Sequence, residues 1–219
     1  HFSGTFPAAQ DDLVIDRQGV NLLGGWYPHT RNEPYTYDLE VNPIKGMIAI
    51  SQGAPVSVGE NHWQMRHPQQ SIVFLAGPYH EYKLQSHGYE FIVWLRSENS
   101  EDSEDVELAQ RFLQISPKYL SDYEKMLGTY PYTKFILVEN FLQTGFGLPA
   151  MTLLGNQVIR LPFILNSSYP HEILHNWWGN GVFVHYESGN WCEGLTTYLA
   201  DHRLQGENLV QSSSEYRRT

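Results

Sequence analysis

Several features are scarce in this chain, and each scarcity excludes a class of protein. Its 219 residues contain one cysteine, Cys192, so no internal disulfide can form and the redox compartment stays open. Basic residues number 14 against 24 acidic ones, which gives a net charge of −10. That balance argues against a nucleic-acid partner, because phosphate backbones are bound by clustered Lys and Arg. No apolar run approaches the ~20 residues of a membrane-spanning helix. The sequence therefore predicts no nucleic-acid partner and no membrane-spanning segment in this chain, and it indicates neither cellular location nor assembly state.

The length and the two ends of the chain bear on its organisation. A chain of 219 residues with 41% hydrophobic residues can form one large domain or two small ones. The first residue is His1, with no charged and then apolar leader after it, and the polar stretch that ends at Thr219 has no helix cap or breaker. We expect a piece of a longer protein, trimmed at both ends.

The N-terminal part is typical of β structure. Short runs with strand-like patterns are separated by Gly, Pro and Asn at the spacing of a sandwich or meander. The expected strands cover residues 35–41, 45–51, 54–58, 62–65, 71–76, 79–84 and 89–95. Residues 97–105 then carry five acids and no apolar side chain. They favour a domain boundary, although a solvated loop inside one domain is the alternative.

Helical signals follow the acidic segment, so the predicted fold class is α+β, with one domain over 1–98 and another over 104–219. Apolar residues recur at helical spacing after Val106, and Ser116-Pro117 is typical of the start of a further helix that ends before Gly128. The other expected elements are a buried strand over 134–138, a loop over 145–155, a helix that opens at 167–170 and a helix over 190–204.

The most informative motif is His171-Glu172-Ile173-Leu174-His175. Two histidines four residues apart lie on one face of a helix, where both rings can reach one metal ion. Glu172 is turned roughly 100° from His171, which makes it a poor ligand but places it near a water on that ion. The alternative is a helix whose histidines are ordinary core or surface residues.

Glu193 is the expected third ligand, because a second predicted helix carries it after 17 intervening residues. Glu187 is the competing carboxylate, in a segment that is typical of a loop. Two histidines and one glutamate suit a single Zn²⁺ and leave a fourth position for water, as a catalytic site requires. We therefore expect a zinc-dependent hydrolase in which Glu172 is the general base. No residue can be assigned to substrate binding.

The segments HEILHNWWGN at 171–180 and NWCEGLTTYL at 190–199 resemble the M1 family of zinc metallopeptidases, which are gluzincin aminopeptidases. The family pattern is HExxHxW-G-N followed by N-E-G at the third ligand. The resemblance is strong from about residue 119 to 205 and weak before it. It implies a truncated β-sandwich-like domain over 1–98 and the first part of a thermolysin-like catalytic domain over 104–219. It also implies His171, His175 and Glu193 as zinc ligands, Glu172 as general base and a peptide substrate.

Three departures from the family pattern qualify this expectation. The spacing between His175 and Glu193 is one residue shorter than usual, and Cys192 stands where the family has Asn. The family's Gly-x-Met-Glu-Asn strand, whose Glu holds the substrate amine, corresponds to the stretch from Gly145 to Leu154, which has no acidic residue. Strict aminopeptidase specificity is therefore not expected, and an endopeptidase-like preference is a hypothesis.

The family's transition-state tyrosine lies well beyond the third ligand, and neither Tyr198 nor Tyr216 can be assigned to that role. We therefore expect this piece alone to bind zinc and to hydrolyse peptides poorly or not at all. Two alternatives remain open: a binding protein that kept the zinc site without turnover, and another hydrolytic reaction, such as epoxide opening, at the same metal.

Overall fold

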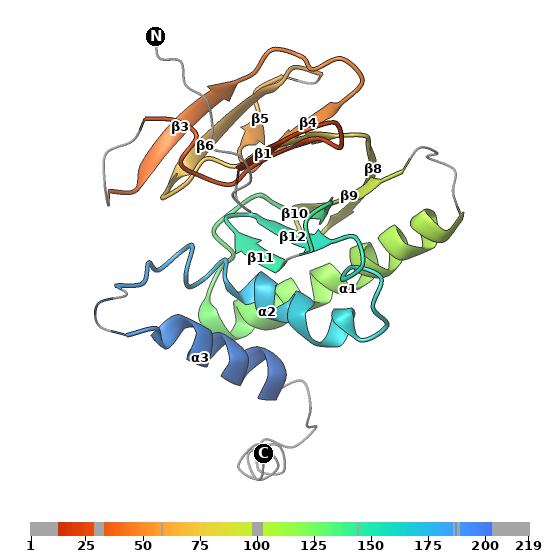
Figure 1. The fold of residues 1–219 in the computed structure, drawn as a ribbon. Helices are drawn as coiled ribbons and strands as arrows, with labels where there is room; N and C mark the ends of the chain where they lie inside the picture. Colours follow the sequence, from red (N-terminus) through yellow and green to blue (C-terminus); the bar gives the residue numbers. More distant parts are fainter. Residues whose placement is uncertain are drawn as a thin grey trace.

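The fold is described from a computed structural model, which covers residues 13–28, 33–57, 59–97, 103–143, 145–185, 187 and 189–202. Within these ranges the chain forms strands and helices stacked in layers, with two small sheets, then a larger sheet, then helices (Figure 1). This arrangement confirms the predicted α+β class. None of the helices in the described part is long and apolar enough to cross a membrane.

Two small antiparallel sheets form the N-terminal layers. One has the order β1 (Leu13–Ile15), β2 (Val20–Leu22), β7 (Phe74–Gly77) and β4 (Ile48–Ser51). The other has the order β3 (Tyr35–Glu40), β6 (His62–Gln69) and β5 (Ala54–Pro55). Buried side chains, including Trp63 and Phe74, pack between them. The strand runs expected from the sequence thus exist, with ends shifted by a few residues.

A five-stranded sheet forms the next layer. Its order is β11 (Gly145–Leu148), β12 (Met151–Gly155), β10 (Lys134–Asn140), β9 (Tyr89–Arg96) and β8 (Tyr79–Ser86). All seven residues of β10 are buried, because both faces of the sheet are covered. Ile136 packs with Leu75 of the neighbouring sheet, while Leu137 faces the core shared with the helices. The predicted buried strand at 134–138 is confirmed.

The predicted domain boundary falls inside this sheet. Strands β8 and β9 precede the acidic segment and β10 follows it, yet β9 and β10 pair in parallel from Lys134 opposite Glu90 to Val138 opposite Trp94. The connection from β9 to β10 contains the long helix α1 (Ser103–Leu127), which lies on the sheet (Figure 1). A division between 98 and 104 stays a prediction, and it would require two pieces that fold separately despite this pairing.

Helix α1 is continuous, so the prediction of a new helix starting at Ser116 is wrong. Pro117 lies inside α1, where it removes one backbone hydrogen bond. The Ser116 hydroxyl donates to the Phe112 carbonyl oxygen at 2.6 Å. The buried stripe continues through this point at helical spacing, with Leu120 and Tyr123 after it. Tertiary burial of that stripe therefore outweighs the local stop signal.

The predicted loop over 145–155 is also wrong, because these residues form the β11–β12 hairpin. The turn is at Pro149 and Ala150, and Ala150 has a φ of 58°. Its amide donates to the side-chain oxygen of Asn176 at 2.9 Å, which holds the turn against the residue that follows His175. The glycines and the proline of this stretch thus belong to a tight hairpin. Its outer strand, β11, is the edge of the sheet.

Candidate metal centre

The two histidines come from the short helix α2 (Ser168–Leu174), which follows the 3-10 turn η1 (Ile164–Asn166). His175 is the residue after the last helical position, and its φ of −59° and ψ of −12° keep it in helical conformation. His171 and His175 therefore share one face, as their spacing predicts. Their ring centroids lie 5.0 Å apart.

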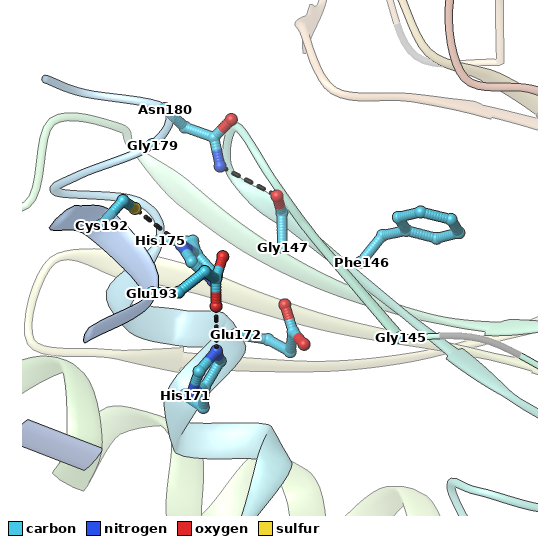
Figure 2. Close-up of a pocket in the computed structure, with 10 residues that line it drawn as sticks. All are labelled: Gly145, Phe146, Gly147, His171, Glu172, His175, Gly179, Asn180, Cys192 and Glu193. Atoms are coloured by element: carbon cyan, nitrogen blue, oxygen red, sulfur yellow. Dashed lines mark hydrogen bonds and ion pairs between the residues drawn. The ribbon is translucent and has the colours of Figure 1, made fainter. Parts of the chain in front are cut away.

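Glu193 comes from helix α3 (Trp191–Thr197), which precedes the π-helical turn η3 (Tyr198–His202). Its carboxylate oxygens lie 3.2 Å from Nε2 of His171 and 3.6 Å from Nε2 of His175. The three ligand atoms all lie within 4.8 Å of one another, and Figure 2 shows them converging. Within the described ranges this is the one such group of three potential ligands. The donor set and its convergence fit one zinc ion.

Glu187, the competing carboxylate, is not part of this group. It is exposed and lies 4.0 Å from His185, which is also exposed. The side chain of His202 and the whole of Tyr216 lie outside the described residues. Tyr198 is 51% exposed, on the turn that follows the helix of Glu193.

The neighbours of His175 orient its ring for ligation. Its Nδ1 lies 3.3 Å from the carbonyl oxygen of Trp178 and 3.6 Å from Sγ of Cys192. A carbonyl can only accept, so Nδ1 carries the proton and Nε2 keeps its lone pair on the side of Glu193. Burial also lowers the pKa of His175, against the opposing effect of Glu193. Burial thus favours the neutral ring, which is the form that binds a metal, while the Trp178 carbonyl fixes its tautomer and raises the pKa.

Glu172 lies beside the ligands but points toward β11 (Figure 2). Burial, followed by the negative charge of Glu193, raises its pKa to about 7, and a hydrogen bond from the Gly147 amide works in the opposite direction. A carboxyl group in this range can accept and release a proton near neutral pH. A bound cation would lower this pKa again, because it favours the carboxylate.

Strand β11 runs so close to α2 that only glycine fits at position 147. A Cβ there would lie 2.7 Å from Oε2 of Glu172 and 2.8 Å from Cβ of His175. The Asn180 side-chain amide donates to the Gly147 carbonyl oxygen at 2.9 Å. Sequence reasoning gave no role to Gly147 or Asn180. The signal available was the Gly-Phe-Gly run, whose small residues permit such a close approach.

A pocket of about 350 Å³ surrounds these groups. It is lined by Gly145, Phe146, Gly147, His171, Glu172, His175, Gly179, Asn180, Cys192 and Glu193. The segment that follows α2 is tied to α3 beside it, since the Trp178 indole donates to the Thr196 hydroxyl at 2.9 Å. The structure thus brings every sequence-predicted site residue into one pocket, and their catalytic and ligand roles stay predictions.

Comparison with known proteins bears on the fold. No family model matches the sequence, and a search of curated proteins returned no match. Solved structures do match. A two-domain M1 zinc metallopeptidase mutant bound to L-arginine superposes with a TM-score of 0.64 at 16% identity, over 89% of this chain and 47% of that one. This chain has part of the M1 zinc metallopeptidase fold.

Two further structures come from Deinococcus radiodurans. An M1 zinc metallopeptidase mutant matches with a TM-score of 0.60 at 15% identity, over 84% of this chain and 45% of that one. A mutant bound to a Tyr-Ser-Ala substrate matches with a TM-score of 0.58 at 17% identity, over 84% and 44%. The chain spans about half the length of the structures it matches. At identities this low, the superpositions show a shared fold and nothing further. The resemblance of the HEILH segment predicts the same fold.

Proposed function

We propose that this chain carries the metal centre of a zinc-dependent peptidase. His171, His175 and Glu193 hold one Zn²⁺, and Glu172 is the general base. The observation that carries the proposal is the convergence of the three ligand atoms within 4.8 Å beside the partly buried carboxyl group of Glu172. Zinc, when bound, supplies a Lewis acid that lowers the pKa of water and polarises a carbonyl.

The chain's own residues then divide the remaining tasks. Glu172 takes a proton on its carboxylate and passes it to the leaving amine. The Gly147 amide holds that carboxylate in place, and Asn180 holds Gly147 from its carbonyl side. Strand β11 is the edge of its sheet, so it offers an extended peptide a partner for backbone pairing.

The proposed substrates are peptides that need no free α-amine. Among the described residues that line the pocket, the carboxylates are Glu172 and Glu193, and both already have roles. The stretch from Gly145 to Leu154, which corresponds to the family strand that carries the amine-binding Glu, has no acidic residue. Turnover of free and N-acetylated peptides of one sequence tests this point. Comparable kcat/KM values are expected, and a strong requirement for the free amine would contradict it.

The metal site itself is tested by elemental analysis of the purified chain. One zinc per chain is expected, and His171→Ala should lose it. In the full-length protein, Glu172→Gln should retain zinc while kcat falls roughly 10²–10⁴-fold, because the variant lacks the base. Hydrolysis that survives this change would reject the base assignment.

A second candidate is a zinc-binding protein without turnover. It is favoured by one position of the β11 edge, Gly147, where both backbone groups already bond to the site's own side chains and so do not pair with a peptide. Full-length wild-type protein that binds zinc but cleaves none of a broad peptide library would support this candidate.

A further inference from the structure

A second pocket lies where the N-terminal sheets meet the start of β10. It measures about 190 Å³, and it shares no lining residue with the metal centre. Its walls come from β6, from Gln52 and from Ala54 of β5, from residues 131–134, and from Ala150 in the turn between β11 and β12. At roughly 30 Å³ per water molecule, this space holds about six waters or a molecule of the size of butyrate.

The described residues that line this pocket are positive in balance. They include Lys134 and Arg66 but no Asp or Glu, in a chain whose net charge is −10. Much of the remaining wall is apolar and includes Met65, Ala54 and Ala150. A cationic pocket with an apolar wall is complementary to an organic anion.

Lys134 is the buried cation, with 7% of its surface exposed. Its ammonium has three donors and donates to the Gly53 carbonyl oxygen. Burial is the main cause that lowers its pKa to about 8, while Glu90 and Glu81 act in the opposite direction through space. Lys134 is one of the residues that line the pocket, and within the described ranges no carboxylate forms an ion pair with its ammonium.

Gln52 supplies a second unused donor. Its side chain is 1% exposed, and its Oε1 accepts from the Tyr37 hydroxyl at 3.1 Å and from the Val73 amide at 3.2 Å. Because a backbone amide can only donate, the amide orientation of Gln52 is settled. Its Nε2 is therefore left buried and has no partner among the described residues. Buried donors without acceptors are unfavourable and rare.

We propose that this pocket binds a small organic monocarboxylate. Lys134 and Gln52 donate to its two oxygens, and Met65 and Ala54 contact its apolar body. One buried ammonium balances one negative charge, which favours a monoanion over a dianion such as phosphate.

The test titrates zinc-free protein with sodium butyrate at constant ionic strength, followed by calorimetry and by backbone amide NMR. Zinc is removed first so that the carboxylate has no metal to bind. Saturable binding with a Kd on the order of 1–10 mM is expected for a ligand of six heavy atoms, with shifts at Gln52 and Lys134. Butyramide, the neutral isostere, should not bind measurably. Inorganic phosphate should bind at least several-fold more weakly.

Variants assign the binding to the two donors. Lys134→Met should abolish measurable binding, and Gln52→Leu should weaken it roughly tenfold. Lys118→Met, the same change at an exposed position of α1, should leave it unchanged. The proposal is overturned if wild-type protein does not saturate, if butyramide or phosphate binds as well, or if Lys134→Met retains its affinity. If Lys134→Met does not fold, Gln52→Leu decides, because it leaves the ammonium in place.

Discussion

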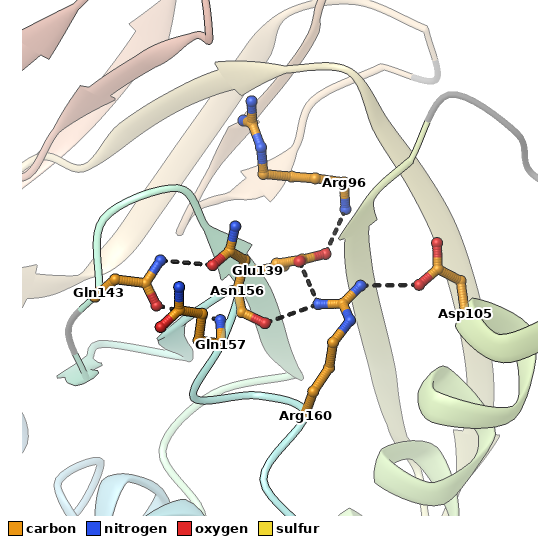
Figure 3. Close-up of polar contacts among 7 residues, drawn as sticks. All are labelled: Arg96, Asp105, Glu139, Gln143, Asn156, Gln157 and Arg160. Carbon is orange, nitrogen blue, oxygen red and sulfur yellow. Dashed lines mark hydrogen bonds and ion pairs between the residues drawn. The ribbon is translucent and has the colours of Figure 1, made fainter.

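Two pairs of carboxylates lie beside the five-stranded sheet and differ in charge balance. Glu139 and Asp105 are paired with an arginine and form the closed cluster, whereas Glu172 and Glu193 of the metal centre have no such partner and form the open cluster. In the closed cluster, Arg160 contacts Glu139 and lies 2.9 Å from Asp105 (Figure 3). The Arg96 amide donates to the other oxygen of Glu139 at 2.7 Å. Glu139 is 2% exposed, yet both of its oxygens have partners. The chain has thus supplied its own counter-charge.

The metal centre also holds two carboxylates, Glu172 and Glu193, but no Lys or Arg lines it. Its permanent partners are the two histidines beside Glu193 rather than a Lys or Arg. The burial that Arg160 makes tolerable for Glu139 instead raises the pKa of Glu172. The difference teaches that charge balance separates a structural cluster from a site that calls for a cationic ligand. The pocket around Lys134 has the opposite charge: there a buried cation has no carboxylate partner among the described residues.

The largest expected effect comes from breaking the closed cluster. Arg160→Met should lower the free energy of unfolding by about 3 kcal/mol, at the low end for a buried pair because Arg160 is partly exposed. Urea unfolding measures this. Lys125→Met removes an exposed ion pair with Asp122 and should cost less than about 0.5 kcal/mol. Equal losses in the two variants would contradict the comparison.

A change at Glu193, in the open cluster, should leave the stability of the zinc-free protein nearly unchanged and should weaken zinc binding. Glu193→Gln removes one of two unbalanced acids, so the unfolding free energy of the zinc-free protein should change by less than about 0.5 kcal/mol. The zinc Kd should rise more than about 100-fold, because a ligand is lost. Competition with a chelator measures the Kd, and a marked destabilisation of the zinc-free variant would show that Glu193 already has its counter-charge within the protein.

The buried Lys134 predicts that the free energy of unfolding depends on pH. The pKa of Lys134 falls from 10.5 to about 8 on folding, so the unfolded chain binds more protons between these values. Stability should therefore rise with pH, by about 1 kcal/mol between pH 8 and 9. Tyrosines whose pKa folding raises above 10, such as Tyr132, reverse the trend as the pH approaches 10, because the unfolded chain ionises them first. Denaturant unfolding at several pH values checks this, and Lys134→Met should flatten the curve where Lys118→Met leaves it intact.

The smallest expected effect concerns the strand over the metal centre. Asn180→Ala removes the donor to the Gly147 carbonyl, which should cost about 1 kcal/mol, or roughly fivefold in kcat/KM of the full-length protein. Amide hydrogen exchange should speed up in β11 and not in β9. Asn156→Ala, at a surface contact with Gln143, is the control. Unchanged exchange in β11 would show that Asn180 does not hold this strand.

Local patterns predicted the elements whose residues act on near neighbours. His171 and His175 share a face because helix geometry repeats every 3.6 residues, and Gly128 ends α1 with a φ of 96°, as its position after the last apolar residue indicates. The wrong predictions, the helix start at Ser116 and the loop at 145–155, are places where distant packing overrode a local stop signal.

By itself, then, the sequence determined which residues can form a zinc site, since an i, i+4 pair on a helix and a carboxylate on the next helix follow from periodicity and donor chemistry. Only the tertiary structure decided which charges are balanced. Arg160 meets Asp105 across 55 positions, and Lys134 meets Gly53 across 81. Contacts over such separations depend on how sheets and helices stack, and no local pattern records that stacking.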